Sequence, residues 1–480
     1  MKSIIQSLSF VGILLGAAFL LSGGVGFLHH DAPRTFLAFF LMGGVCFLAS
    51  WISWQASPRG LEIRIREAIL LVLSTWIFTG IIGALPYLVL GICRDPMSAL
   101  FESVSGITTT GASVLSNLES LPRALLFWRS LTHFLGGVGI LVMFIAVLPF
   151  VGTGAMQLYR TESTGPISEK ITARIADTAR IMVGIYLLFN VLCAAALRVC
   201  GLSWFDAVCH AFGTIATGGF STRSESIAAF HNPAVEWVIA FFMFISAVSF
   251  VIHFRALRGD VLSYLRSQEV RFFVLLGAAS AALASIFIVQ KTETGLMTGI
   301  RNAVFQTVSL FSTTGFTTAD YDVWPDAVKL TLLTLMIIGG CAGSTSGAVK
   351  SVRFVVAGKL IARRFGNMLH PARVQAIKLD GRVIDNDSAG RAAFYIFLYF
   401  FVLCVASVFV GFFSQDILTA VSAVIACLGG VGPGMSGAGP SETYALFPAA
   451  AKMGLIVCML LGRLEIYICL VVFTPGFWKT

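Results

Sequence analysis

Long apolar runs alternate with short polar segments along the whole chain. Many of the runs reach about 18 or more residues, enough for an α-helix to cross a bilayer. From residue 68 onwards one plan occurs four times: a spanning run, a shorter apolar run, a loop of glycine and hydroxyl residues, and a second spanning run. The pattern therefore predicts four such repeats, preceded by two extra spanning helices over residues 4–28 and 36–54.

Each repeat is expected to contain a spanning helix, a short helix, a loop and a return helix. The predicted ranges, in that order, are 68–92, 96–108, 109–113 and 124–150; 176–200, 204–216, 217–222 and 235–255; 270–289, 300–312, 313–320 and 327–362; 392–413, 417–428, 429–436 and 447–473. The corresponding division of the chain is residues 1–57 for the two N-terminal transmembrane helices, then 58–160, 161–258, 259–385 (with a broken return helix) and 386–480 for pore repeats 1 to 4.

The short helices decide the predicted architecture. About 13 residues give roughly 20 Å of helix, which cannot cross a hydrocarbon core of about 30 Å. Irregular backbone at membrane depth is tolerated where protein buries it or where it lines a watery cavity. We therefore expect an all-α polytopic membrane protein, in which four re-entrant loops surround a central pore with pseudo-fourfold symmetry.

Composition and charge agree with a membrane protein. Of 480 residues, 57% are hydrophobic and 12% charged, against about 25% charged in soluble domains. The net charge of +9 comes from basic residues gathered in alternate connections, which is the positive-inside pattern rather than a nucleic-acid signal. This bias places both termini in the cytoplasm with four segments, which hold Arg59, Arg64 and Arg66; Arg160, Lys170, Arg174 and Arg180; Arg255, Arg258, Arg266 and Arg271; and the basic residues of 350–391.

Residue chemistry argues against an enzyme or a resident cofactor. The ten cysteines are scattered without a CxxC pair, and His133, His210 and His253 each lie singly in apolar surroundings. Neither pattern has the spacing of metal ligands. No clustered catalytic residues are present, so we expect no prosthetic group.

The four loops offer backbone carbonyls instead. Glycine lets the backbone approach an ion closely, and carbonyls from four loops could replace the hydration shell of a potassium-sized cation. Any one glycine could be ordinary loop punctuation, but four at matched positions favour a selectivity filter. The predicted filter residues are Thr109, Thr110, Gly111; Ala216, Thr217, Gly218; Thr313, Thr314, Gly315; and Gly430, Val431, Gly432.

The third return helix contains a cluster of helix breakers, IGGCAGSTSGAV, over residues 338–349. Each glycine costs about 1 kcal/mol in a helix relative to alanine, so an unwound loop below the filter is predicted. We interpret it as a gate, with close helix packing through small residues as the alternative. The predicted gate residues are Gly339, Gly340, Gly343, Ser344, Thr345, Ser346, Gly347 and Arg463.

Charged residues also occur inside the fourth return helix, at Lys452, Arg463 and Glu465. Intramembrane charges usually face a cavity or a partner. Arg463 could project into the pore below the filter and act as a barrier to cations. It could equally pair with Glu465 or extend toward the membrane face, and the sequence leaves these alternatives open.

The motifs SGITTTGAS, HAFGTIATGGFSTRSES, STTGFTTADY, GGCAGSTSGAVKSVR and MLLGRLEIY together resemble the TrkH/TrkG/KtrB superfamily of bacterial potassium-translocating subunits, and the two extra N-terminal helices favour the TrkH and TrkG branch. The resemblance covers nearly the whole chain. It implies one filter glycine per repeat, with glycine rather than serine at position 111 favouring potassium. It also implies a gating loop at residues 339–347 and a pore-side arginine at Arg463.

The same resemblance implies assembly and location. Members form homodimers in the bacterial inner membrane and work with a cytosolic nucleotide-binding ring protein of the TrkA type, for which the basic residues 350–391 are a plausible docking surface. Relatives often carry asparagine shortly before the fourth filter glycine, whereas this chain has Gly429, Gly430 and Val431. The fourth quadrant is therefore expected to discriminate less between potassium and sodium.

The expected function is potassium uptake through a carbonyl-lined filter with an intramembrane gate, and the transported ion is potassium. The alternative is a potassium transporter coupled to sodium or protons, a symport. The absence of a visible intramembrane Asp/Glu relay in the sequence argues against coupling.

Overall fold

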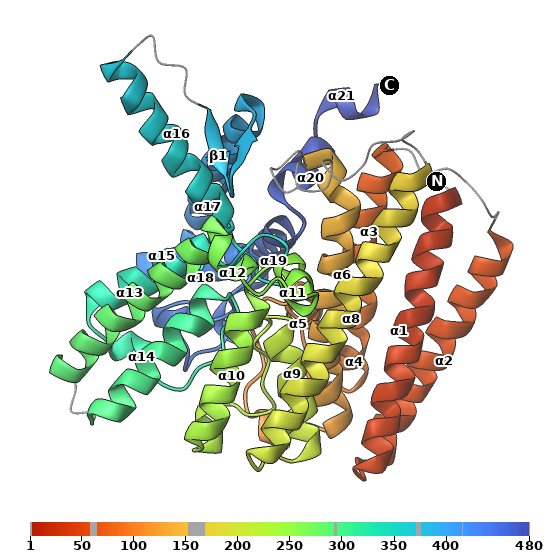
Figure 1. Ribbon diagram of the computed structural model, residues 1–480. Helices are drawn as coiled ribbons and strands as arrows, with labels where there is room; N and C mark the ends of the chain where they lie inside the picture. Colours follow the sequence, from red (N-terminus) through yellow and green to blue (C-terminus); the bar gives the residue numbers. More distant parts are fainter. Residues whose placement is uncertain are drawn as a thin grey trace.

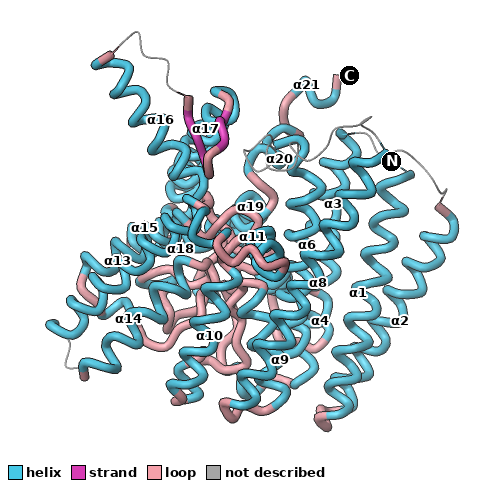
Figure 2. Tube along the Cα trace, in the orientation of Figure 1, coloured by secondary structure: helices cyan, strands magenta, loops and turns pink. Residues whose placement is uncertain are grey.

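The computed structural model describes residues 2–57, 65–151, 169–291, 295–370, 376–414 and 416–479 as a bundle of helices, with loops concentrated at its centre (Figures 1 and 2). The predicted repeat boundaries at 57–58 and 160–161 include residues outside these ranges. Arg59, Arg64 and Arg160 also lie outside them. Both termini lie at the end of the molecule where α16 (Ser351–Leu369) projects (Figure 1).

The two N-terminal helices, α1 (Lys2–Leu28) and α2 (Pro33–Ala56), pack on each other at one side of the bundle (Figure 1). Only α1 makes extensive contact with the repeats, through α3 (Ile65–Gly83) and α6 (Arg123–Val151). Many side chains of α2 therefore stay exposed on the outside of the bundle, where apolar residues would face lipid.

The repeats contain the expected order of helices. Repeat 1 comprises α3, α4 (Leu85–Val89), α5 (Pro96–Ile107), η1 (Leu118–Ser120) and α6. Repeat 2 comprises α8 (Glu169–Val199), α9 (Trp204–Ile215), η2 (Ala228–Phe230), α10 (Pro233–Ser246) and α11 (Phe250–Leu257). Repeat 3 comprises α12 (Ser263–Arg266), α13 (Gln268–Lys291), α14 (Leu296–Phe311), η3 (Tyr321–Val323), α15 (Asp326–Ile338) and α16. Repeat 4 comprises α17 (Asn386–Gly411), α18 (Ile417–Gly429), η4 (Ser436–Ala438), η5 (Tyr444–Leu446), α19 (Ala449–Arg463), α20 (Ile466–Val471) and α21 (Pro475–Trp478).

Seven helices in the described ranges are long and apolar enough to cross a membrane, or eight if α10 and α11 count as one bent span. The prediction of an all-α, multi-pass membrane protein is confirmed. A short antiparallel hairpin, β1 (Ile377–Leu379) with β2 (Arg382–Ile384), lies beside α16. Ile377 pairs with Ile384, and both side chains are buried in a small apolar cluster with α16.

The predicted break in the third return helix is present, because α15 ends at Ile338 and α16 begins at Ser351. Two further breaks were not predicted. The second return helix, expected to be continuous over 235–255, bends by 97° between α10 and α11. There the loop of repeat 3 replaces helical hydrogen bonds: Cys341 N–H donates to the Ala247 carbonyl.

The fourth return helix, expected to be continuous over 447–473, also breaks. It ends at Arg463 and resumes at Ile466, with Glu465 at a positive φ of +66°. A non-glycine residue rarely adopts this conformation without tertiary support. The expectation of unbroken second and fourth return helices was therefore wrong, because contacts from other repeats determine where these helices end.

Candidate functional site

Four short helices, α5, α9, α14 and α18, lie inside the bundle. Three of them begin at a capping side chain, because Asp95, Ser203 and Asp416 each accept hydrogen bonds from main-chain amides of the first helical turn. Such caps satisfy amides that have no partner within the helix. The polar caps therefore fix where these three short helices start, and the loops follow the C-terminal ends of all four.

All four short helices end in the same Schellman motif, in which a left-handed residue follows the helix and the amide of the next residue bonds back to the carbonyl five positions earlier. The left-handed residues are Thr109, Thr217, Thr313 and Gly430, with φ between 52° and 66°. The next amides, of Thr110, Gly218, Thr314 and Val431, donate to carbonyls five positions earlier over 2.8–2.9 Å. A β-branched residue at positive φ is a genuine outlier, and such strain clusters at functional sites.

The glycines that follow close a ring. Gly111, Gly219, Gly315 and Gly432 all have positive φ. A Cβ at each of them would lie within 3.0 Å of a carbonyl oxygen of the next loop, which belongs to Gly218, Thr314, Val431 and Thr110 respectively. Loop 1 thus meets loop 2, loop 2 meets loop 3, loop 3 meets loop 4, and loop 4 meets loop 1. Only glycine permits so close an approach.

The register in repeat 2 differs from the predicted one. The sequence pattern matched Gly218 to the other three glycines, but the structure places Gly219 at that position. Gly218 instead corresponds to Thr110, and Ala216 is the C-cap residue directly after α9. A Cβ on Gly218 would meet the ring of His133. The two adjacent glycines of TGGF are thus required for different contacts, Gly218 for the His133 ring and Gly219 for the Thr314 carbonyl. The spacing of glycines in the sequence could not distinguish these two roles.

The segments that follow the ring glycines in neighbouring loops are also joined in a closed ring by hydrogen bonds. These bonds run from Leu118 N–H to Ser224 Oγ between loops 1 and 2, from Ile227 N–H to the Thr317 carbonyl between loops 2 and 3, from Ser436 N–H to the Asp322 carboxylate between loops 3 and 4, and from Tyr444 N–H to the Ser113 carbonyl between loops 4 and 1. Four segments about 100 residues apart in sequence therefore form one connected structure.

Oxygen atoms are what this site offers to a ligand. The four residues whose carbonyls meet the ring glycines, Thr110, Gly218, Thr314 and Val431, are buried. The hydroxyl of Thr109 is buried and has no hydrogen-bond partner within the described part of the structure. Hard cations prefer neutral oxygen ligands of this kind. No cluster of three or more His, Cys, Asp or Glu that could hold a metal ion occurs in the described part of the chain.

The loop between α15 and α16, residues 339–350, lies against the C-terminal ends of three short helices. Thr345 Oγ1 donates to the Ile215 carbonyl at the end of α9 over 2.9 Å. Gly347 N–H donates to Thr313 Oγ1 over 2.7 Å, and a Cβ on Gly347 would meet the Gly429 carbonyl at the end of α18. The predicted gate residues of this loop are all buried: Gly339, Gly340, Gly343, Ser344, Thr345, Ser346 and Gly347.

Arg463 lies at the end of α19 and is 5% exposed. Its Nη1 donates to the Thr345 carbonyl over 2.7 Å, while its Nε and Nη2 have no hydrogen-bond partner among the described residues. The alternative of an Arg463–Glu465 pair was wrong, since Glu465 pairs with Arg353 at 2.7 Å. Lys350 Nζ donates to the Ser346 carbonyl. Two cationic side chains thus bind successive carbonyls of the loop.

Sequence reasoning missed the polar residues behind the loops. Glu102 of α5 and Arg129 of α6 form a buried ion pair, and both were visible in the sequence as charges within apolar runs, a signal of function in membrane helices. His210 is not isolated, because its Nε2 lies 2.9 Å from Ser221 Oγ. His133 packs on Phe220 with ring centroids 4.2 Å apart.

Comparison with known proteins agrees with this architecture. Residues 36–479 match the model of the TrkH family, described as cation transport proteins. The chain belongs to the TrkH family. It is 40% identical to the Trk system potassium uptake protein TrkH of Halomonas elongata over 87% of each chain, and 36% identical to the TrkH of Salmonella typhimurium over 100% of this chain and 99% of that protein.

A solved structure also matches over the whole chain. The crystal structure of the potassium transporter TrkH from Vibrio parahaemolyticus superposes with a TM-score of 0.91 at 32% identity, covering 100% of this chain and 99% of that one. The TrkH family resemblance inferred from the motifs is confirmed, and so is the expectation of a transport protein rather than an enzyme.

Proposed function

We propose that this protein is the ion-conducting subunit of a potassium uptake system, and that the ring of four loops is its selectivity filter. The observation that carries the proposal is the closed succession of ring glycines and facing carbonyls, Gly111 to Gly218, Gly219 to Thr314, Gly315 to Val431 and Gly432 to Thr110. Relatives named as Trk potassium uptake proteins support potassium as the cargo.

A potassium ion would exchange its hydration water for these carbonyl oxygens. Each short helix points its C-terminal end, the negative end of its dipole, toward its loop. The hydroxyl of Thr109, which is buried and has no hydrogen-bond partner among the residues that the structure describes, would supply a further ligand below the carbonyls. One ring of carbonyls offers fewer layers than a longer filter, so selectivity is expected to be lower than in channels with several layers.

Residues 339–350 are proposed as the gate. The loop is bonded to the ends of α9 and α14 through Thr345 and Gly347, and Arg463 and Lys350 hold its carbonyls. Conduction would require these hydrogen bonds to break, so that the loop moves away from the filter. Until then the two cationic side chains would repel a cation that leaves the filter.

The protein is proposed to lie in the bacterial inner membrane with both termini in the cytoplasm. The helix α16, which carries Lys359, Arg363 and Arg364 in its second half, and the hairpin lie on the side of the termini (Figure 1), as the positive-inside rule requires. We further propose a homodimer that contacts membrane lipid and works with a cytosolic nucleotide-binding ring of the TrkA type. Residues 350–391 would provide the docking surface for that ring, and nucleic acid is not an expected partner.

The proposal is tested by cation flux into proteoliposomes that hold the purified protein, with a potassium gradient and sodium as competitor. Potassium-favoured flux that follows the membrane potential is expected, either for the protein alone or after the cytosolic partner is added to the same vesicles. Flux that requires a sodium or proton gradient would overturn the channel proposal and favour the coupled transporter. Absence of potassium-dependent flux with the partner present would refute both.

A further inference from the structure

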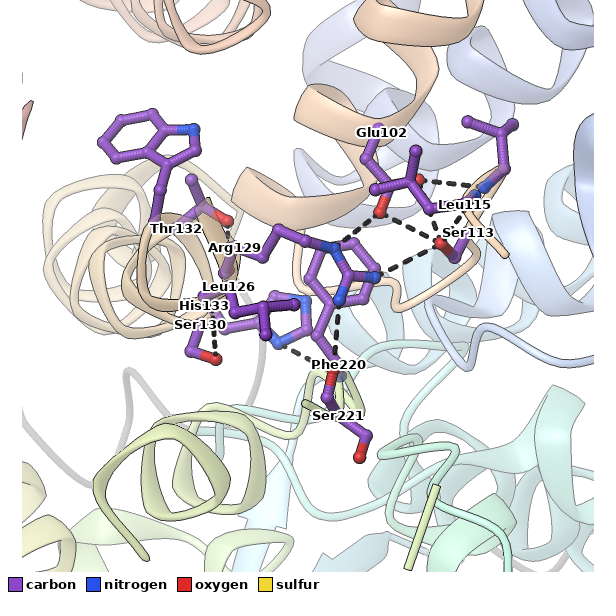
Figure 3. Close-up of polar contacts among 12 residues, drawn as sticks. Glu102, Ser113, Leu115, Leu126, Arg129, Ser130, Thr132, His133, Phe220 and Ser221 are labelled. Carbon is purple, nitrogen blue, oxygen red and sulfur yellow. Dashed lines mark hydrogen bonds and ion pairs between the residues drawn. The ribbon is translucent and has the colours of Figure 1, made fainter. Parts of the chain in front are cut away.

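A fully buried ion pair lies behind loops 1 and 2 (Figure 3). Arg129 Nε donates to Glu102 Oε1 over 2.9 Å, and the two side chains are 2% and 0% exposed. Removing two charges from water is costly, so a buried pair is weak evidence for stabilisation and can often be replaced by apolar residues. The reason for this pair is therefore better sought in its position and in the loop residues to which it is hydrogen-bonded.

Arg129 binds the same position of two different loops. Its Nη1 donates to the Ser221 carbonyl over 3.0 Å, and its Nη2 donates to Ser113 Oγ over 3.2 Å. Ser113 lies two residues after the ring glycine of loop 1, and Ser221 lies two residues after that of loop 2. The planar guanidinium holds its donors in a fixed fork. Arg129 therefore sets the distance between the segments of loops 1 and 2 that contain Ser113 and Ser221.

Glu102 completes the arrangement on the side of loop 1. Its carboxylate accepts hydrogen bonds from Ser113 Oγ at 3.0 and 3.1 Å and from Val114 N–H at 2.9 Å. Ser113 is thus held by both members of the ion pair, as Figure 3 shows. Hydrogen bonds to charged groups are shorter and stronger than neutral ones, so the ion pair holds Ser113 and Val114 firmly in place.

On the side of loop 2, the residue after the ring glycine is Phe220. Its ring contacts the Arg129 guanidinium at 4.0 Å and the His133 ring at 4.2 Å. Phe220 N–H donates to His133 Nδ1 over 3.4 Å. Because His133 also occupies the space beside Gly218, one face of α6 sets the position of loop 2.

The described parts of the other repeats contain no equivalent bridge. The position seven residues before the left-handed residue is Glu102 in repeat 1 and His210, Gln306 and Ala423 in repeats 2 to 4. His210 lies near Ser221 Oγ, and Gln306 donates to the Ala319 carbonyl, so each bonds within its own repeat. Within the described residues, a buried ion pair joins two loops only between repeats 1 and 2.

We propose that Glu102 and Arg129 are positioning residues for cation selectivity. By holding Ser113 and Ser221 they fix the distance between the carbonyls of Thr110 and Gly218, which lie three residues earlier in each loop. They set the discrimination between potassium and sodium without touching the ion. This inference rests on the proposed function of the ring as a filter.

The test uses the full-length protein in proteoliposomes and measures the potassium-to-sodium permeability ratio from reversal potentials. Arg129→Gln alone would leave a buried carboxylate unpaired and endanger folding. The double variant E102Q/R129Q removes both charges together, and Arg129→Lys keeps the charge but loses the fork. Both variants are expected to lower the permeability ratio about three- to tenfold, since each loses charged hydrogen bonds between the loops, while total cation flux persists.

The matched control is E236Q/R301Q, because the Glu236–Arg301 pair at 2.7 Å joins the helices α10 and α14 rather than two loops. Its permeability ratio should equal that of the unmodified protein. An unchanged ratio in well-folded E102Q/R129Q and Arg129→Lys would overturn the inference while the filter stands. An equal fall in the control would overturn it too, by showing a general effect of lost ion pairs. An unmodified protein without potassium preference would instead refute the filter itself.

Discussion

Two glycines of the proposed filter make it possible to separate two effects on selectivity, the close contact between loops and the strain of the backbone. Gly315 has φ +83° and Gly430 has φ +66°, so alanine at either position costs about 1–2 kcal/mol of backbone strain. Only at Gly315 would the new Cβ meet another loop, at the Val431 carbonyl and at Pro433 Cδ. Gly430 has open space around its Cβ position, and repeats 1 to 3 carry threonine there.

The size of the expected loss of selectivity follows from this contact. To restore ordinary packing in Gly315→Ala, the Val431 carbonyl must move by roughly 1 Å or more, a displacement larger than the difference in size between potassium and sodium ions. A loss of about 1.4 kcal/mol in preference for potassium is tenfold. We therefore expect the potassium-to-sodium permeability ratio of Gly315→Ala to fall at least about tenfold, and that of Gly430→Ala to stay within about threefold.

The assay is the reversal potential under mixed potassium and sodium gradients, with folding of each variant checked by its thermal transition in detergent. Gly184→Ala in α8 is a helix control, because nothing lies within 4 Å of its Cβ position. Equal losses of selectivity in Gly315→Ala and Gly430→Ala would show that strain, and not the ring contact, matters. Full selectivity in a folded Gly315→Ala would remove this glycine from the filter.

Other predictions concern the gate and its supports. Arg463→Gln, which weakens the bond to the Thr345 carbonyl and removes a cation, should raise partner-free potassium flux several-fold; a flux no higher than that of the unmodified protein would argue against a barrier. Thr345→Val removes the bond to the Ile215 carbonyl, so it should also raise partner-free flux, and a decrease would contradict the gate. Glu465→Gln leaves the buried Arg353 without its ionic partner and should lower stability by about 1–3 kcal/mol, measured as a fall in thermal midpoint; an unchanged midpoint would show that the pair contributes little.

The sequence alone determined the elements that depend on local composition. The length of the apolar runs predicted the spanning helices. The short apolar runs before each loop predicted α5, α9, α14 and α18, with ends that differ from the observed ones by a few residues at most. The glycine cluster at 338–349 predicted the break between α15 and α16. These features follow from burial of apolar side chains and from the cost of glycine in helices, which act within one segment.

Only the tertiary structure decided how the segments meet. The choice of Gly219 over Gly218 depends on the His133 ring and on the Thr314 carbonyl, which lie in other repeats. The breaks at Ala247 and Glu465 occur in stretches without a glycine cluster, and the first is held by bonds to the loop of repeat 3. Long-range contacts of this kind override helix propensity, because each buried backbone group must find a partner somewhere in the fold. The sequence therefore specified the four units, and their mutual packing specified the ring between them.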